Sequence, residues 1–310
     1  MKRPFVLKQD NPEPIILAEA TVPLTDRSYL FGDSIYEVIS THNGQPFFIE
    51  DHLERLYASA EGIYMTLPWP MDWFTRQIHH GLALALEDLP AASDATAPPS
   101  ETYVRIIVSR GVSDFNIDVA DAGEPQVHFI FKEAPQYTGR FREEGFYLRV
   151  ASTRRNAPQA LNPAFKTGNY LNNVMGLREA THAGADDALF LDVHGAVTEA
   201  STSNFFMVKD QTIITAPMNV GILGGITRKH LLTVAQELGI PVEERPFDLD
   251  ELWTADECFV SSSLKGAMPV HRIDDHTFPV GYGPITQRLD TAYWKHVEAH
   301  IAKQTSEVNA

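Results

Sequence analysis

Residues 162–173 read "NPAFKTGNYLNN", and one lysine, Lys166, lies there in a run of small and amide residues. Tyr170 follows it by four positions. Most lysines are exposed to solvent and contribute mainly to solubility, so this stretch by itself predicts a surface charge. Whether Lys166 has a chemical role depends on which residues elsewhere in the chain accompany it.

Composition narrows the class of protein. A chain of 310 residues with 44% hydrophobic and 21% charged residues is typical of a soluble, folded protein of about two domains. Its 25 basic and 41 acidic residues give a formal net charge of −16, which repels phosphate backbones. We therefore expect no nucleic-acid partner.

The single cysteine and the N-terminal residues indicate the cellular compartment. The one cysteine, Cys258, lies in the apolar run "ECFVSS" and is expected to be a buried, inert thiol, which fits a reducing cytoplasm. The opening "MKRPFVLKQDNPEP" lacks the apolar segment of a signal peptide, and no apolar stretch reaches the roughly 18 residues that span a bilayer. We expect a cytoplasmic protein with no membrane partner.

Hydrophobic periodicity divides the chain into two parts. Residues 134–145, "APQYTGRFREEG", interrupt the pattern with proline, glycine and charge, so we expect them to link a domain over 1–133 to one over 146–310. Residues 90–101 are expected to form a flexible surface loop. The expected strands are 13–24, 34–40, 44–49, 102–110, 125–133, 146–154, several within 187–217, 257–263 and 267–273, and the expected helices are 50–65, 71–89, 170–184, 227–240 and 285–304.

Three further stretches carry chemical groups, each with an ordinary alternative. "GILGGITR" (221–228) places a glycine pair before a helix, whose free amides can bind an anion, although a plain N-cap by Thr227 is the commoner case. Glu199 in "VTEASTSNFF" can pair with a cation or a protonated ring nitrogen, or be solvated. "FVSSSLKG" (259–266) offers hydroxyl groups at the end of a strand, where their usual role is to cap that end. No His-Glu-x-x-His or Gly-x-Ser-x-Gly motif is present, so we expect no metal site and no serine nucleophile.

The order of these features resembles that in the class IV (fold type IV) aminotransferases, which use pyridoxal 5′-phosphate. Along the chain they are the lysine stretch, Glu199, the Gly-Ile-Thr helix start and the hydroxyl cluster. The family includes branched-chain aminotransferases, D-amino acid transaminases and aminodeoxychorismate lyase. The resemblance also covers "TDRSYLFGDSIYEVI" (25–39), "DHLERLYASA" (51–60) and "ELWTADECFVSSSLKGAMPV" (251–270). It implies an α/β (α+β) fold with an N-terminal α/β sandwich, a C-terminal pseudo-barrel, the cofactor in the cleft between them, and a homodimer whose partner subunit completes the pocket.

The resemblance also implies roles at the cofactor. Lys166 would hold it as a Schiff base and move the proton between the substrate Cα and the cofactor C4′, and Glu199 would face the pyridine nitrogen. Tyr170 would bind the phenolic oxygen, although branched-chain members commonly have this tyrosine five residues after the lysine. Leu223 would pack on the ring. The expected phosphate contacts are Arg55, Gly225, Ile226, Thr227, Ser262 and Ser263.

Arg55 illustrates a conflict between pattern and resemblance. In the helix 50–65 the apolar stripe consists of Leu53, Leu56, Tyr57, Ala60 and Tyr64. Arg55 projects away from that stripe, so the pattern predicts a solvated arginine, whereas the resemblance predicts a phosphate ligand. We give precedence to the resemblance, because a helix at a domain junction can use its second face.

The substrate residues are expected on two strands. Alternation in "TYVRIIVSR" places Tyr103 and Arg105 on one face, and the resemblance makes this Tyr-x-Arg element a carboxylate site. In "SIYEVIS", Tyr36, Val38 and Ser40 match pocket positions, although many relatives have a basic residue where this chain has Ser40. Leu264 completes the expected pocket. The linker arginines Arg140 and Arg142 are expected to be solvated.

We therefore expect transamination between an amino acid, with branched-chain substrates favoured, and a 2-oxo acid. The loop "GVSDFNID" (111–118) lacks the Arg-x-His element of D-amino acid transaminases, which argues against a standard D-specific enzyme. A D-amino acid or (R)-amine transaminase, an aminodeoxychorismate lyase and a non-catalytic binding protein on the same scaffold are the alternatives.

Overall fold

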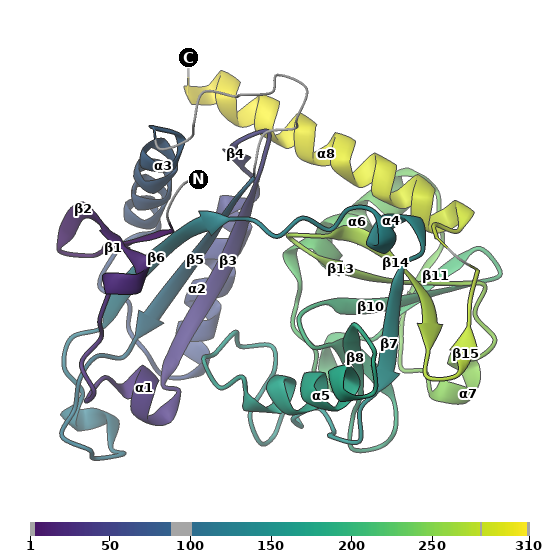
Figure 1. Cartoon of the computed structure of the whole chain (residues 1–310), viewed down its shortest axis with the longest axis horizontal. Helices are drawn as coiled ribbons and strands as arrows, with labels where there is room; N and C mark the ends of the chain where they lie inside the picture. Colours follow the sequence, from purple (N-terminus) through teal and green to yellow (C-terminus); the bar gives the residue numbers. More distant parts are fainter. Residues whose placement is uncertain (1–3, 88–100, 280, 309–310) are drawn as a thin grey trace. The chain divides into compact units, whose positions relative to one another are not determined.

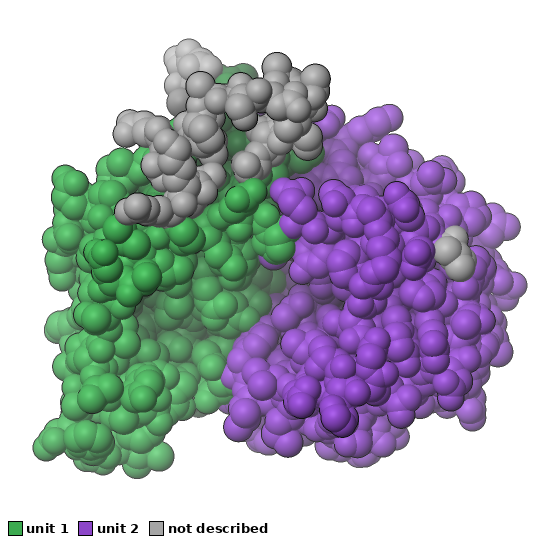
Figure 2. Space-filling view, in the orientation of Figure 1, with its two compact units in different colours: residues 1–135, 165–169, 303–310 green, residues 136–164, 170–302 purple. Residues whose placement is uncertain are grey.

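The computed structural model describes residues 4–87, 101–279 and 281–308. The chain divides into two compact units, coloured green and purple in Figure 2. Unit 1 comprises 1–135, 165–169 and 303–310, and unit 2 comprises 136–164 and 170–302. The short segment around Lys166 thus belongs to unit 1. Of the loop expected at 90–101, only Glu101 lies among the described residues.

Unit 1 is built on a six-stranded antiparallel sheet with the order β2-β1-β6-β5-β3-β4 (Figure 1). The expected alternation holds in β5, where Val104, Ile106 and Val108 have 0% exposure. Its strands are β1 (Phe5–Lys8), β2 (Asn11–Ile16), β3 (Ser34–His42), β4 (Gln45–Pro46), β5 (Thr102–Ser109) and β6 (Gln126–Glu133).

Two helices cover one face of this sheet (Figure 1). They are α2 (Ile49–Gly62) and α3 (Met71–Glu87), and both were expected from their periodicity. Buried side chains of α2 and α3 pack with those of the strands in one hydrophobic core. The short elements of the unit are α1 (Arg27–Phe31), η1 (Leu17–Glu19) and η2 (Val119–Asp121).

Four features of unit 1 differ from the expectations. The strand expected at 13–24 ends at Ile16, where η1 begins. The strand expected at 44–49 ends at Pro46, because the buried residues after it lead into α2. Strand β1, four residues long, was not predicted. Tyr64 does not extend the apolar stripe: it follows the end of α2 with a positive φ of 56° and is 91% exposed. Short apolar runs do not distinguish strands from helix ends by periodicity.

Unit 2 contains a nine-stranded sheet that closes on itself. The path runs β12-β11-β10-β13-β14-β7-β8-β9, and β9 pairs back to β10 at Glu199 and Asn204. The expected mixed α/β fold with a pseudo-barrel is therefore confirmed. Its strands are β7 (Phe146–Val150), β8 (Asp187–Leu191), β9 (Val197–Ala200), β10 (Asn204–Lys209), β11 (Thr212–Thr215), β12 (Val242–Glu244), β13 (Glu257–Ser262), β14 (Gly266–Ile273) and β15 (His276–Thr277).

The three long helices of unit 2 lie where the periodicity predicts them, whereas the four-residue helices at 140–143, within the expected linker, and at 249–252 were not predicted. α5 ends before Gly184, whose φ of 82° matches the expected left-handed position. Glu257 accepts hydrogen bonds from the amides of Ile285 and Thr286 at the start of α8. The helices are α4 (Arg140–Glu143), α5 (Leu171–His182), η3 (Met218–Val220), α6 (Ile226–Glu237), α7 (Leu249–Leu252) and α8 (Pro284–Val308), the last of which runs into the residues 303–310 of unit 1.

Candidate active site

The backbone of Lys166 is held by β3 and α2. The segment 165–169 pairs with β3 like a short antiparallel strand: Tyr36 N donates to Lys166 O at 2.9 Å, and Gly168 N donates to Ser34 O at 2.7 Å. Lys166 N donates to Ser59 Oγ of α2 at 3.0 Å. Gly168 permits this close approach, since a Cβ there would lie 2.2 Å from Ser34 Oγ. The lysine is thus fixed by unit 1.

The amine of Lys166 lies against Tyr36. Its Nζ is 3.3 Å from Tyr36 Oη and 4.4 Å from the ring centroid. The Arg105 guanidinium also contacts the Tyr36 ring, with Cζ 4.1 Å from the centroid. Tyr36 is 5% exposed and Lys166 is half-buried. The structure therefore brings together three residues that the sequence selected from positions far apart.

The other expected substrate residues share this face. In the β3–β5 register Val38 lies opposite Arg105, and Ser40 lies opposite Tyr103, and directly opposed residues project to the same side of a sheet. Arg105 Nε is buried and has no hydrogen-bond partner among the described residues. A buried donor without a partner is costly unless a ligand satisfies it, so this guanidinium is suited to a carboxylate.

Arg55 is not the solvated residue that its helical pattern predicts. Its Nε and Nη2 donate to the two carboxylate oxygens of Glu37, each at 2.7 Å, and its side chain is 12% exposed. His52 Nδ1 lies 2.8 Å from Glu37 Oε2. Glu37 and His52 are both 0% exposed. Burial alone would raise the pKa of Glu37, but Arg55 and His52 hold it well below its usual value, and burial lowers the pKa of His52.

Glu199 has a comparable environment in unit 2. Arg155 donates to its Oε1 from Nε at 2.9 Å and from Nη2 at 2.8 Å. Its Oε2 accepts from Asn204 Nδ2 at 3.2 Å and from the amide of Leu223 at 3.0 Å. Glu199 is 4% exposed, so the solvated alternative is wrong. A buried carboxylate that is paired with an arginine is a suitable partner for a protonated ring nitrogen.

The start of α6 supports the anion-binding interpretation. The N-cap is Gly225, not Thr227, and no described side chain caps this end. The amide groups of Ile226 and Thr227, in the first turn, can therefore donate hydrogen bonds to an anion. Gly225 also permits the close approach of Asn204, because a Cβ there would lie 2.0 Å from Asn204 Oδ1.

The hydroxyl cluster lies at the turn between β13 and β14. Ser262 pairs with Gly266 across that turn, and Ser263 and Leu264 lie within it. The neighbouring Lys265 is 3% exposed and donates to Ser203 Oγ at 2.8 Å, so the turn is fixed to the segment that follows Glu199. Tyr170 occupies the N-cap position of α5. Ligand roles for these residues remain predictions.

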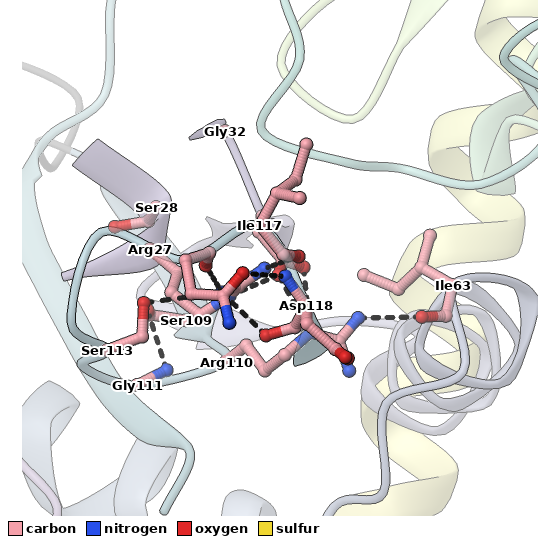
Figure 3. Close-up of polar contacts among 12 residues, drawn as sticks. Arg27, Ser28, Gly32, Ile63, Ser109, Arg110, Gly111, Ser113, Ile117 and Asp118 are labelled. Atoms are coloured by element: carbon pink, nitrogen blue, oxygen red, sulfur yellow. Dashed lines mark hydrogen bonds and ion pairs between the residues drawn. The ribbon is translucent and has the colours of Figure 1, made fainter. Parts of the chain in front are cut away.

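A buried network fixes the loop after β5 (Figure 3). Arg27, 2% exposed, donates to the carbonyl oxygens of Asn116 and Ile117 at 2.7 and 2.9 Å. Its Nε and that of Arg110 both donate to Asp33 at 2.8 Å, and Arg110 also binds Ile63 O at the end of α2. The loop that lacks the Arg-x-His element therefore has a defined backbone.

Several other expectations can be compared with the structure. Cys258 is buried, and burial raises its pKa well above the ordinary value, as an inert thiol requires. Arg140 and Arg142 are not merely solvated, since they pair with Asp186 and Asp290. Within the described ranges no three His, Cys, Asp or Glu residues are grouped to hold a metal ion, and no helix there is long and apolar enough to cross a membrane.

Sequence comparison identifies the family. The family "Amino-transferase class IV" matches residues 34–273, which is more than half of the 310-residue chain. The chain therefore belongs to the class IV aminotransferases, and it is an enzyme of the transferase class. The members of this family depend on pyridoxal phosphate.

Known proteins resemble the chain along most of its length. A putative branched-chain-amino-acid aminotransferase of Methanocaldococcus jannaschii is 34% identical over 87% of this chain and 89% of its own. A D-alanine aminotransferase of Bacillus licheniformis is 32% identical over 92% and 95%. The crystal structure of a branched-chain aminotransferase from Thermoproteus uzoniensis with norvaline superposes with a TM-score of 0.80, at 28% identity, over 94% of each chain.

Sequence reasoning missed the partners of the two expected ligands. Glu37 and His52 hold Arg55, while Arg155 and Asn204 hold Glu199. A weak signal existed for Glu37, a charged residue that shares the core face of β3 with Ile35 and Ile39. We found no comparable signal for Arg155, which is separated from Glu199 by 44 residues.

Proposed function

We propose that this enzyme transfers amino groups between an amino acid and a 2-oxo acid, using pyridoxal 5′-phosphate bound to Lys166 through a Schiff base. The observation that carries the proposal is the half-buried amine of Lys166, held 3.3 Å from Tyr36 Oη on a backbone fixed by β3 and α2. When bound, the cofactor supplies an aldehyde for amines and a ring that accepts electron density from the substrate Cα.

The expected site residues would have separate roles at the cofactor and the substrate. Lys166 would move the proton at the substrate Cα, since an amine that is partly removed from water can both accept and donate a proton. Glu199 would hold a proton on the ring nitrogen. Tyr170 would bind the phenolic oxygen and Leu223 would pack on the ring. The phosphate would bind Arg55, the amides of Ile226 and Thr227, and Ser263, with Gly225 and Ser262 beside them.

The substrate we favour is a branched-chain-like amino acid. Arg105, with its unpartnered Nε, would bind the carboxylate beside Tyr103, while Tyr36, Val38, Ser40 and Leu264 would surround the side chain. The similarity to a branched-chain relative at 34% and to a D-alanine relative at 32% does not separate the two substrates. The missing Arg-x-His element in 111–118 favours the former.

We also propose a cytoplasmic homodimer. The loop that Arg27 fixes exposes apolar side chains that a monomer would leave in water, among them Phe115 at 68% and Ile117 at 78%. Sedimentation equilibrium of the purified protein, compared with a Phe115→Asp and Ile117→Asp double variant, would test this. A wild type that sediments as a monomer would contradict the dimer.

The test of the activity is a half-reaction panel. The protein reconstituted with pyridoxal 5′-phosphate is mixed with single L-amino acids, D-amino acids and (R)-amines, and the absorbance change of the cofactor is followed. We expect the largest rate with a branched-chain L-amino acid, and none in Lys166→Ala. Near-normal transamination by Lys166→Ala would refute the proposal, whereas release of 4-aminobenzoate from aminodeoxychorismate would indicate the lyase.

A further inference from the structure

Glu37 occupies an unusual position for a charge. It shares the core face of β3 with Ile35 and Ile39, and all three side chains have 0% exposure. Burying a carboxylate in such a face is costly unless it is paired and hydrogen-bonded. An apolar residue at this position would continue the core without that cost, so stability alone does not explain the glutamate.

The partners of Glu37 show what it does. Arg55 Nε and Nη2 each reach a different carboxylate oxygen at 2.7 Å, so the two groups form a fork that defines the plane of the guanidinium. His52 Nδ1, 2.8 Å from Oε2, fixes the carboxylate in turn. His52 and Arg55 come from the same helix, which the buried Leu53 and Leu56 lock against the sheet.

A phosphate group is sensitive to this plane. A guanidinium binds phosphate through parallel N–H donors, and the strength of such a contact depends on the direction in which the donors point. An arginine side chain that is already fixed loses less conformational freedom when it binds. Glu37 therefore has a consequence for ligand binding that an aliphatic residue of the same size lacks.

We propose that Glu37 is a positioning residue that fixes the Arg55 guanidinium for the cofactor phosphate. This inference rests on the proposed function, in which Arg55 is a phosphate ligand. Glu37 acts through Arg55, because its side chain lies on the core face of β3, opposite the face of Tyr36. Its loss should weaken recognition of the phosphate and spare recognition of the rest of the cofactor.

The experiment compares two aldehydes that differ only in the phosphate. Dissociation constants of pyridoxal 5′-phosphate and of pyridoxal are measured by absorbance for the wild type, Glu37→Gln, Glu37→Asp, Arg55→Met and the Glu37→Gln/Arg55→Met double variant. We expect Glu37→Gln to weaken the phosphate form about tenfold and pyridoxal by less than about twofold. In the Arg55→Met background the same change should have no further effect.

Asp33 provides the matched control. It is also a mostly buried carboxylate of unit 1, 14% exposed, and it binds the guanidinium groups of Arg27 and Arg110. Asp33→Asn should lower the unfolding temperature without changing the ratio of the two dissociation constants. Glu37→Asp keeps the charge but shortens the side chain, so the carboxylate no longer reaches both guanidinium nitrogens. It should therefore reduce the preference for pyridoxal 5′-phosphate over pyridoxal even if Glu37→Gln does not fold.

The outcomes separate the two proposals. If the wild type forms no Schiff base with either aldehyde, the proposed function fails. If the wild type discriminates in favour of the phosphate form and Arg55→Met abolishes this discrimination, but both Glu37 variants retain it, the positioning role is overturned. Equal weakening of both aldehydes by the Glu37 variants would also overturn it, because it would indicate a structural role alone.

Discussion

A buried arginine–glutamate pair lies in each unit, and the two pairs are arranged in opposite ways. In unit 1 the proposed cofactor ligand is the cation, Arg55, and the carboxylate of Glu37 holds it. In unit 2 the proposed ligand is the carboxylate, Glu199, and the cation Arg155 holds it. The same interaction would therefore support the proposed phosphate ligand in one unit and the proposed ring-nitrogen ligand in the other.

The third partners of the pairs also differ. Glu37 has His52, a group that can titrate, whereas Glu199 has the amide of Asn204, which cannot. Arg155 is likewise held by two amide oxygens, from Asn172 at 3.1 Å and Asn173 at 3.0 Å. We infer that mild acid lowers the stability of unit 1 through His52.

The largest expected effect concerns Glu199. Glu199→Gln should keep the shape and lose the charge, so the ring nitrogen would lose its proton and the rate would fall about 10²- to 10⁴-fold while the cofactor still binds. Steady-state kinetics with the best donor from the panel measure this. Glu257→Gln is the control, since Glu257 is also a buried glutamate of unit 2 and only caps α8. A Glu199→Gln enzyme with an unimpaired rate would refute the role of Glu199 at the ring nitrogen.

A smaller effect is expected from Arg155→Met. It would leave Glu199 buried without its cation, which should cost about 3 kcal/mol in the free energy of unfolding. Urea denaturation measures this cost. The control is Arg245→Met, because Arg245 forms a bidentate pair with Glu251 but is 37% exposed, and its loss should cost less than about 1 kcal/mol. Equal costs would show that burial does not distinguish the pairs.

The smallest expected effect tests the response to acid. Burial lowers the pKa of His52 in the folded protein below its value of 6.5 in the unfolded chain, so the unfolded state binds the proton first and stability falls as the pH decreases below 6.5. His52→Asn keeps a donor toward Glu37 but does not titrate. Between pH 6.5 and about pH 5 the free energy of unfolding should fall by about 1 kcal/mol less in this variant than in the wild type. Parallel pH profiles would contradict the titration of His52.

Much of the fold was predictable because most helices and strands have a strong periodicity of hydrophobic residues. The alternation of β5 and the stripe of α2 through Leu53, Leu56 and Ala60 both correspond to buried faces. Prediction failed where an element is short, as in β1, or where an apolar run such as 47–49 suits a strand and a helix entry equally.

For the candidate site, the sequence indicates the proposed ligands but not the residues that hold them. Lys166, Arg55 and Glu199 follow from a motif order, but their partners follow from three-dimensional proximity. The pattern of α2 predicts that Arg55 is solvated, because the helix shows no sign of the carboxylate 18 residues earlier in β3. Ion pairs between distant residues leave no period in a single sequence, so the pairing of Glu37 with Arg55 and of Arg155 with Glu199 is seen only in the structure.

The most direct test of the account is the location of the covalent bond. The reconstituted protein is reduced with borohydride, digested, and the pyridoxyl-labelled peptide is identified by mass spectrometry. We predict a single label, on Lys166. Lys265 is buried, and burial lowers its pKa, which makes it the natural competitor; a label there, or on any other lysine, would contradict the assignment.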